Sequence, residues 1–345
     1  MQTAKPGQPG SPPILSRAKE LVYPSLREAV DELHPGIRHM VEYHLGWIDA
    51  EGRPDSRGGK SVRPAFAVLS AEAAGAPAQT AVPAAVAIEL VHNFSLLHDD
   101  IMDQDRERRH RTTVWARYGV AAGIISGDAL VVLALDQLLR RPEPAALAAA
   151  RRVWADTRDM IGGQVDDLGF EERVAVTWEE CVAMEAQKTG ALLACSACVG
   201  AILAEAPAPV VEGLAGFGMH VGLAFQAVDD MLGIWGRPEV TGKPTSSDLR
   251  RSKKSLPISA ALEVEGPGRD ELAGLLGDFH TREPAESELE RAVELIESSG
   301  SRERTARYAA DHLRAALEML DSLPIVPEAH AELAGLARFL GERDY

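Results

Sequence analysis

Two apolar stretches with helical spacing each end in a pair of aspartates. The first covers residues 84–97 and is followed by Asp99-Asp100-Ile101-Met102-Asp103, and the second covers residues 221–228 and is followed by Asp229-Asp230. Residues four positions apart lie on one face of a helix, so Asp99 and Asp103 are expected to stand one above the other. The pattern predicts buried helices that carry carboxylate clusters at their ends.

The remaining sequence favours an all-α fold. Hydrophobic residues make up 46% of the 345, which is enough for a sizeable core, and Val, Ile and Thr form no convincing alternating runs. We expect one all-α domain over residues 14–345, preceded by a disordered tail, rich in Pro, Gly and Ser, over residues 1–13. Helices are predicted over residues 14–32, 36–47, 82–103, 119–139, 144–168, 178–204, 210–235 and in the C-terminal third.

Charge and cysteine content exclude several classes of function. The net charge of −16 makes a nucleic-acid partner a poor expectation. Cys181, Cys195 and Cys198 form no disulfide or metal framework and are predicted to be reduced core thiols. No secretory leader and no uninterrupted apolar stretch of transmembrane length are expected, so a cytoplasmic location is predicted.

A basic segment follows the first aspartate cluster and contains Arg106, Arg108, Arg109 and Arg111. Such a pattern is usual for a salt-bridged surface. The second aspartate pair, at residues 229–230, favours a functional site instead. Carboxylates repel a phosphate unless divalent cations lie between them, and arginine binds the oxygens that the cations leave uncovered. The pattern therefore indicates a site for a metal-bridged diphosphate.

An ordered set of motifs resembles the trans-polyprenyl diphosphate synthases of the all-α isoprenoid synthase fold, most closely bacterial geranylgeranyl diphosphate synthases. The resemblance covers residues 20–325 and implies a helical bundle around a central apolar cavity. The motifs are Gly58-Gly59-Lys60-Ser61-Val62-Arg63-Pro64, the segment 99–103 with Arg108-Arg109, Gly127-Asp128, Lys188-Thr189-Gly190, Phe225-Gln226 with Asp229-Asp230, and Thr241-Gly242-Lys243-Pro244.

The resemblance implies a short-chain prenyltransferase that works as a homodimer with two or three Mg²⁺ ions per active site. Its substrates would be isopentenyl diphosphate and an allylic diphosphate, namely dimethylallyl, geranyl or farnesyl diphosphate. The allylic substrate loses diphosphate, the double bond of isopentenyl diphosphate attacks the resulting cation, and a proton leaves. Cationic groups stabilise the departing diphosphate, and an apolar cavity excludes water from the carbocation.

The roles of individual residues are implied by the same resemblance. The implied metal set is Asp99, Asp103 and Asp229, with Asp100 and Asp230 as supporting carboxylates. The positions matching the allylic diphosphate site are Arg108, Lys188 and Lys243. The positions matching the isopentenyl diphosphate site are Lys60, Arg63, His92 and Arg109. The positions near the reacting carbons are Thr189 and Gln226. In the family the leaving diphosphate is thought to take the proton, so no protein base is required.

Product length is expected to depend on Phe94, five residues before Asp99 and about 7.5 Å back along the helix axis. An aromatic residue there, with the small Ser95 beside it, resembles geranylgeranyl diphosphate synthases, so a C20 product is favoured. The alternative is that Phe94 is an ordinary core residue and that another residue limits the chain. Farnesyl diphosphate synthase activity is the alternative product assignment.

Three positions depart from the family pattern. Gly233 and Arg237 stand where carboxylates are expected after the second aspartate pair, and Thr112 stands where a proline often follows the arginine pair. A class I terpene cyclase and a non-catalytic regulatory subunit of a prenyl synthase are the alternative functions. Lys60, Arg63 and His92 have the structural alternative of being ordinary loop or core residues. Gln164 and Asp167 are expected either to approach the ligand pocket or to pack between helices. Lys253 and Lys254 are expected either to close the loop over the ligand or to be solvated charges. Binding of a protein shell through residues 1–13 is a further hypothesis.

Overall fold

The computed structural model describes residues 11–55, 59–140, 143–173, 175–236, 246–251 and 253–342. The contacts between residues divide the chain into two units. Unit 1 comprises Met1–Ala155, Cys195–Ala215 and Leu323–Gly335, and unit 2 comprises Asp156–Ala194, Gly216–Ser322 and Leu336–Tyr345. The division falls within four helices, which are α7 (Pro144–Glu171), α9 (Ala191–Leu203), α10 (Ala208–Trp235) and α17 (Pro327–Gly341).

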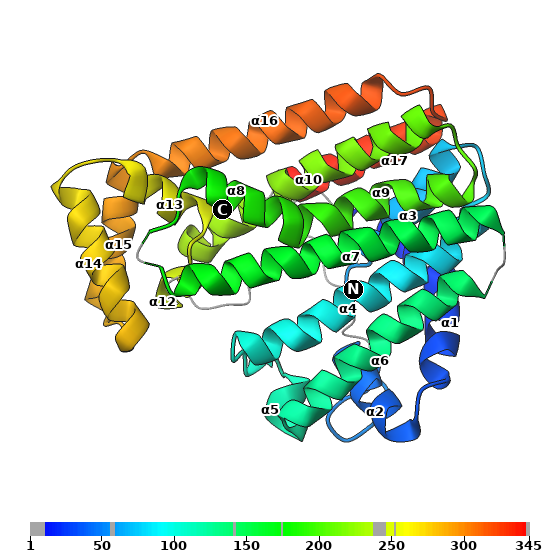
Figure 1. Cartoon of the computed structure of the whole chain (residues 1–345), viewed down its shortest axis with the longest axis horizontal. Coiled ribbons are helices and arrows are strands. Elements are labelled where there is room, and N and C mark those ends of the chain that lie inside the picture. Colours follow the sequence, from blue (N-terminus) through cyan, green and yellow to red (C-terminus); the bar gives the residue numbers. More distant parts are fainter. Residues whose placement is uncertain are drawn as a thin grey trace, which may run out of the picture. The chain divides into compact units, whose positions relative to one another are not determined.

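Unit 1 is built around α4, whose neighbours in this unit include α1, α3, α5 and α6. Figure 1 shows α4 and α6 lying side by side. The two helices approach closely because a Cβ at Gly123 would meet Ile101, and a Cβ at Gly127 would meet His98. The elements of unit 1 are α1 (Pro13–Asp31), α2 (Pro35–His44), α3 (Val62–Ala73), η1 (Ala78–Ala81), α4 (Val82–Met102), β1 (Glu107–Arg108), β2 (Arg111–Thr112), α5 (Val114–Tyr118) and α6 (Val120–Leu139).

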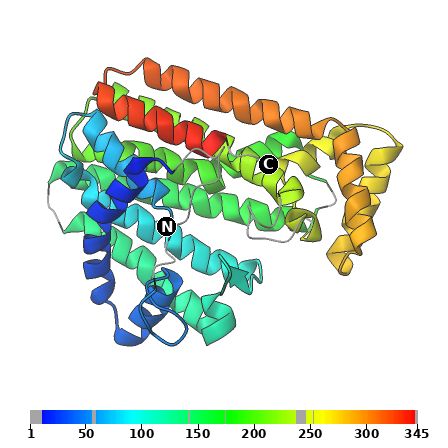
Figure 2. The same ribbon diagram turned by 180° about the vertical axis from the view of Figure 1, so that it is seen from behind.

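Among its described residues, unit 2 contains two apolar clusters. One contains Trp178, Met231 and Leu256, and the other contains Ile234 and Leu276. Figure 2 shows α14 and α15 side by side at one end of this unit. The elements that lie wholly in unit 2 are α8 (Trp178–Glu185), the π-helical η2 (Ala186–Gly190), α12 (Ser247–Arg250), α13 (Leu256–Glu263), α14 (Pro267–Thr281), α15 (Glu286–Ser298) and α16 (Ser301–Asp321).

Local signals explain where several helices begin. Thr177 caps α8, because its hydroxyl accepts a hydrogen bond from the Glu180 amide at 3.2 Å while the Glu180 carboxylate accepts one from the Thr177 amide at 2.9 Å. Proline lies in the first turn of α1, α2, α4 and α13, where its missing N–H has no intrahelical partner to lose. The predicted helix bounds agree with the structure to within a few residues.

The all-α fold is confirmed, with one addition. The strands β1 and β2 form a two-residue antiparallel hairpin directly after the first aspartate cluster. The three cysteines are buried thiols, as expected. The single domain from residue 14 stays a prediction, and residues 1–10 of the predicted tail lie outside the described residues.

The expectation that no uninterrupted apolar stretch reaches transmembrane length stays a prediction. Among the described residues, four helical segments are long and apolar enough to cross a membrane by length and composition, with up to two charged residues in the apolar window: Ala78–Met102, Val120–Leu139, Trp178–Leu203 and Ala208–Trp235. Three of them have half or more of their apolar window buried inside the protein, and a helix packed on most sides is apolar all round. The fourth, α6, has only 39% of its window buried.

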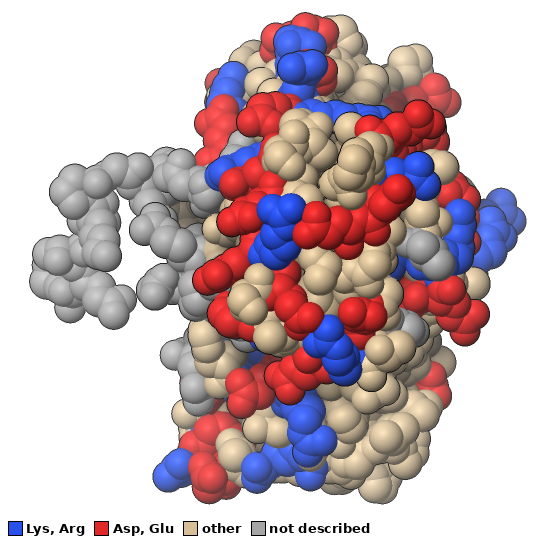
Figure 3. All heavy atoms as spheres, turned by 90° about the vertical axis from the view of Figure 1, so that its left-hand side faces the viewer, with Lys and Arg blue, Asp and Glu red and all other residues tan. Residues whose placement is uncertain are grey.

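Among the charged side chains on the face in Figure 3, acidic ones are the more prominent, with Lys and Arg side chains between them. On α14 and α15 the arginines pair with carboxylates of neighbouring turns or helices, as in Arg291–Glu271 at 2.7 Å and Arg282–Glu288 at 2.6 Å. Each exposed pair adds little stability. A surface with this mixture of charges offers no basic stripe of the kind that binds nucleic acid on the face shown.

Candidate active site

The first aspartate cluster lies at the C-terminal end of α4 in unit 1. Asp99 and Asp103 are partly exposed, whereas Asp100 is only 1% exposed. Nε of Arg108 donates to Oδ1 of Asp100 at 2.6 Å. Burial raises the pKa of Asp100 to about 6, although the Arg108 guanidinium acts in the opposite direction. Asp100 therefore binds Arg108, whereas Asp99 and Asp103 are the aspartates that solvent can reach.

A second cluster in unit 1 contains the buried charged side chains of Arg63 and Glu89. Burial lowers the pKa of Arg63 to about 10, while the negative charge of Glu89 acts in the opposite direction. Glu89 is 7% exposed, and Nδ2 of Asn93 donates to its backbone carbonyl at 2.7 Å and to its carboxylate at 3.3 Å. The Glu89 carboxylate thus compensates a buried guanidinium and helps to keep it in place.

His92 lies on the same helix as Glu89, one turn further along. Burial lowers its pKa well below the ordinary value, and the positive charges of Arg63, Arg109 and Arg108 lower it further. The imidazole is therefore neutral at pH 7. Three predicted isopentenyl diphosphate residues, Arg63, His92 and Arg109, are thus close enough to interact electrostatically. The fourth, Lys60, is exposed and follows Gly59, where a Cβ would lie 3.2 Å from Nη1 of Arg109.

A pocket in unit 1 adds a residue that the sequence reading missed. Its lining includes His44, at the end of α2, together with Asp100, Arg108, Arg109 and Arg111. Burial and these three arginines lower the pKa of His44 to about 3. Nε2 of His44 is buried without a hydrogen-bond partner among the described residues. Nothing in the sequence indicates that His44, which directly follows a tyrosine on an amphipathic helix, belongs to this site.

In unit 2, the predicted Lys188-Thr189-Gly190 motif lies in the π-helix η2, a distortion that often marks functional sites. Lys188 forms an ion pair with Asp167 of α7. The Thr189 hydroxyl donates to Oε1 of Gln226 at 2.7 Å, and Nε2 of Gln226 donates to Oδ1 of Asp230 at 2.8 Å. The motif and the second aspartate pair are therefore joined by one hydrogen-bonded chain.

Asp230 and its neighbour Asp229 have different surroundings. Asp229 is exposed, whereas Asp230 is 5% exposed and its Oδ2 accepts a hydrogen bond from the Leu256 amide at 2.8 Å. Burial raises the pKa of Asp230 to about 6. Burial and then Asp230 raise the pKa of Glu185 well above its ordinary value. Glu185 and Asp230 are therefore two neighbouring buried carboxyls with raised pKa values.

Glycines let α7 and α10 approach the π-helix closely. A Cβ at Gly163 of α7 would meet the backbone of Lys188, and a Cβ at Gly222 of α10 would lie 2.9 Å from Cα of Gly190. Next to Gly163, both polar atoms of the Gln164 side chain are buried without a partner among the described residues. The earlier expectation that Gln164 approaches a ligand pocket stays a prediction, and this buried amide favours it.

Gly233, one of the departures from the family pattern, lies against Asp248 of α12. A Cβ at position 233 would meet the Asp248 carboxylate. Asp248 also raises the pKa of Asp230 through its negative charge. The Asp248 carboxylate of α12 thus lies next to position 233, where a carboxylate is expected from the family pattern and this sequence has glycine. The other departure, Arg237, and the residues Gly58 and 241–244, including Lys243, lie outside the described residues.

The residues predicted to set product length lie on α4, in unit 1. Phe94 is 8% exposed, and its ring packs edge-on against His98 with 5.1 Å between ring centroids. Nε2 of His98 is 3.1 Å from the backbone oxygen of Ile124 on α6. The hydroxyl of Ser95 donates to the His92 carbonyl at 2.9 Å. Their effect on product length stays a prediction.

The donor sets fit Mg²⁺ bound jointly with a substrate. Among the described residues, no three His, Cys, Asp or Glu side chains are grouped so that they hold a metal ion by themselves. Mg²⁺ typically binds to one or two carboxylates and completes its shell with water and phosphate oxygens. Asp99 and Asp103, one turn apart at a helix end, and the exposed Asp229 provide such partial sets of hard oxygen ligands.

Comparison with known proteins identifies the family. The polyprenyl synthetase family model matches residues 54–296. The chain belongs to the polyprenyl synthetase family. This polyprenyl synthetase is 46% identical over 333 residues to the (2E,6E)-farnesyl diphosphate synthase of Mycobacterium tuberculosis, covering 96% of this chain and 93% of that protein. It is 40% identical over 313 residues to the geranylgeranyl diphosphate synthase of the same organism, covering 89% and 88%.

Solved structures agree with this assignment. The polyprenyl synthetase from Streptomyces coelicolor A3(2) superposes with a TM-score of 0.90 at 47% identity and covers 95% of this chain and 98% of that one. The geranylgeranyl pyrophosphate synthase of Corynebacterium glutamicum, complexed with isoprenyl diphosphate and magnesium, superposes with a TM-score of 0.80 at 26% identity, covering 96% and 98%. The predicted family is confirmed, and with it trans-prenyltransferase activity; the product length is left open, because relatives of both product classes match.

Proposed function

We propose that this polyprenyl synthetase condenses isopentenyl diphosphate with a short allylic diphosphate, and that its main product is geranylgeranyl diphosphate. The observation that carries the proposal is the end of α4. There Asp99 and Asp103 face outward, and Asp100 is turned inward to hold Arg108. This arrangement supplies metal ligands and a guanidinium on one short segment, as an anionic leaving group requires.

The residues divide into groups that serve the two substrates. Asp99, Asp103 and Asp229 would hold Mg²⁺, which when bound neutralises the diphosphate that departs. Arg108 and Lys188 would bind the allylic diphosphate, with Lys243 as a predicted third cation. Thr189 and Gln226 would face the reacting carbons, joined by their hydrogen bond of 2.7 Å. Lys60, Arg63, His92 and Arg109 would bind isopentenyl diphosphate.

Asp248 adds to the second metal group in this proposal. Its carboxylate lies against Gly233, which replaces the last carboxylate of the usual second motif. If Asp248 of α12 compensates for Gly233 of α10, its carboxylate must lie near the second metal group when the diphosphate binds. The exchange Asp248→Asn is therefore expected to increase the Mg²⁺ concentration needed for half-maximal activity, whereas Asp278→Asn on α14 serves as a control.

Incubation of the purified full chain with Mg²⁺, isopentenyl diphosphate and each allylic diphosphate tests the activity. A C20 diphosphate identified by mass is the expected product. Accumulation of a C15 diphosphate would replace the product assignment by farnesyl diphosphate, which the 46% identical relative favours. Absence of any elongation would overturn the proposal in favour of a regulatory subunit. A cyclic hydrocarbon formed from geranylgeranyl diphosphate alone would indicate a terpene cyclase.

We also propose a homodimer and a cytoplasmic location, as expected from the family resemblance. The exposed side of α6 supports a second copy as the partner, because Val120, Ile124, Ile125, Val132 and Leu139 are each 44–67% exposed on this one helix. Apolar exposure of this kind is typical of an interface. Light scattering is expected to give twice the chain mass, and Val132→Glu is expected to give a monomer. A monomeric parent protein would contradict the proposal.

A further inference from the structure

The hairpin that follows the first aspartate cluster has an unusual turn. Arg108 of β1 pairs with Arg111 of β2, so Arg109 and His110 alone form the turn. Both turn residues have a left-handed backbone, with φ of 53° and 59°. Two-residue hairpin turns of this type normally use Asn and Gly, because a β-carbon is strained at positive φ. The turn therefore persists only because its surroundings hold it.

The pair that closes this turn also carries two like charges. Arginines directly opposite each other in a hairpin repel one another. Here their guanidinium groups are bound in different places. Nε of Arg108 donates to Asp100 at 2.6 Å, and Nη2 of Arg111 donates to the carbonyl of Ile48 at 2.7 Å. The Arg111 guanidinium also lies 4.4 Å from the ring centroid of Tyr43.

Tyr43 provides a second attachment for the same strand. Its hydroxyl donates to the backbone carbonyl of Thr112 at 2.7 Å. Arg111 and Thr112 are the two residues of β2. This strand is therefore attached to the Tyr43 side chain on α2 and to the Ile48 carbonyl in the loop that follows α2. Together these contacts oppose the strain and the charge repulsion that would otherwise open the hairpin.

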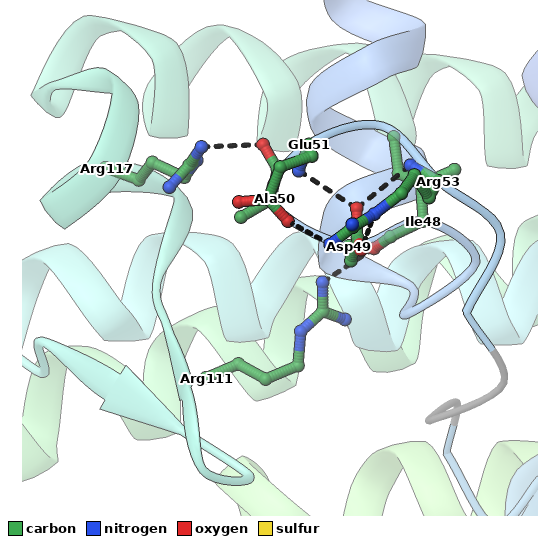
Figure 4. Close-up of polar contacts among 7 residues, drawn as sticks. All are labelled: Ile48, Asp49, Ala50, Glu51, Arg53, Arg111 and Arg117. Atoms are coloured by element: carbon green, nitrogen blue, oxygen red, sulfur yellow. Dashed lines mark hydrogen bonds and ion pairs between the residues drawn. The ribbon is translucent and has the colours of Figure 1, made fainter.

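The loop that accepts the Arg111 hydrogen bond is held by hydrogen bonds within the loop and by one from Arg117 of α5 (Figure 4). Oδ1 of Asp49 accepts hydrogen bonds from the amides of Glu51 and Arg53, both at 2.9 Å. Arg117 donates to the carbonyl of Ala50 at 2.6 Å. The Ile48 carbonyl is therefore a fixed acceptor, and Arg111 attaches the hairpin to a rigid support.

The strained turn presents Arg109, which the proposed function assigns to isopentenyl diphosphate. Nη1 of Arg109 lies close to Gly59, directly before Lys60. We propose that Arg111 is a positioning residue for isopentenyl diphosphate: by attaching β2 to the Ile48 carbonyl and to Tyr43, it keeps the Arg109-His110 turn in its strained form with Arg109 beside Gly59. The proposal rests on the proposed function and adds to it a residue that does not touch the substrate.

Steady-state kinetics of Arg111→Gln test the proposal. The KM for isopentenyl diphosphate is expected to rise roughly tenfold, while kcat and the KM for the allylic diphosphate change little, because only the presentation of Arg109 is lost. Hydrogen exchange of the amides in residues 106–113 is expected to become faster. Arg158→Gln on α7, an arginine with an 81% exposed side chain, is the matched control.

A second variant distinguishes positioning from direct binding. His110→Gly removes the strain at one turn position, so the double variant Arg111→Gln/His110→Gly is expected to recover most of the affinity for isopentenyl diphosphate. An Arg111→Gln variant whose KM equals that of the parent would overturn the proposal. A raised KM without rescue by glycine would also overturn it, because Arg111 would then bind the diphosphate itself.

Calorimetric binding of isopentenyl diphosphate separates this proposal from the proposed function. A parent protein that binds this compound without elongating any allylic diphosphate counts against the function alone. In that case, equal binding by the parent and Arg111→Gln still overturns the role of Arg111, and weaker binding that glycine restores still supports it. A parent protein that does not bind isopentenyl diphosphate overturns both.

Discussion

The carboxylate of Asp248 lies in the space that a side chain at Gly233 would need. Gly233 belongs to α10 and Asp248 to α12, so the two positions meet only through the fold of unit 2. The glycine that departs from the family motif and the carboxylate beside it therefore form one feature. Replacement of this glycine has consequences opposite to those at an ordinary helical glycine.

Gly233→Ala is expected to reduce the free energy of unfolding by about 1–3 kcal/mol, because the added Cβ displaces Asp248. Gly274→Ala on α14 is the matched control: nothing lies within 4 Å of its added Cβ, so the better helix propensity of alanine stabilises by up to about 1 kcal/mol. Urea unfolding measures both values. Equal effects of the two substitutions would contradict the role given to Asp248.

Asp167→Asn is expected to destabilise the free protein by about 1–3 kcal/mol, because the partly buried Lys188 ammonium loses its counter-charge. A bound diphosphate replaces that charge. The increase in melting temperature on addition of an allylic diphosphate analogue with Mg²⁺ should therefore be larger for the variant than for the parent. Asp166→Asn, an exposed neighbour on α7, is the control. An equal ligand-induced increase in both proteins would argue against Lys188 as a diphosphate ligand.

His44 predicts a pH dependence of stability. Its folded-state pKa is about 3, below the ordinary 6.5, so the unfolded chain binds a proton between these values and the folded chain does not. The contribution of neutral His44 to the free energy of unfolding is present above pH 6.5. It decreases by about 2 kcal/mol between pH 7 and pH 5, because the unfolded chain gains a proton on this residue and the folded chain does not. His44→Gln should remove that part of the loss, as measured by urea unfolding at both pH values without ligands.

The exposed His39 on the same helix provides the control for this measurement. His39→Gln is expected to keep the pH dependence of the parent protein. If His44→Gln also keeps it, the buried imidazole is not the group that titrates on unfolding.

Phe94→Ala is expected to shift the product distribution toward longer prenyl chains, because the ring lies five residues before Asp99 on α4. The ring is 8% exposed and packs against His98, so its removal also costs about 3–5 kcal/mol of stability. Phe94→Leu, which keeps more of the packing, provides a milder variant. Mass analysis of the products measures the effect, and an unchanged product length in both variants would show that another residue limits the chain.

Much of the fold could be predicted because helical periodicity is a local property. The helices around residues 82–103 and 210–235 were predicted to within two residues of α4 and α10. The hairpin at Arg108 and Arg111 was missed, since its turn contains neither glycine nor asparagine. The π-helix was missed as well, because the sequence Ala186–Gly190 continues an ordinary helical pattern.

The candidate site shows the same division. The paired aspartates were visible in the sequence, but the sequence does not distinguish the buried Asp100 and Asp230 from their outward-facing neighbours. That difference arises from partners distant in sequence, such as the Leu256 amide 26 residues beyond Asp230. His44 and Asp248 were missed for the same reason.

The sequence by itself determined the helices, the residue types at their ends and the family, because these depend on short-range spacing and on the order of motifs. Only the tertiary structure decided which carboxylates are exposed, that Lys188 is paired with Asp167, and that Asp248 fills the space beside Gly233. Burial and hydrogen bonding depend on groups brought together from different helices. The two aspartates of each pair therefore differ in role although they are identical and adjacent in the chain.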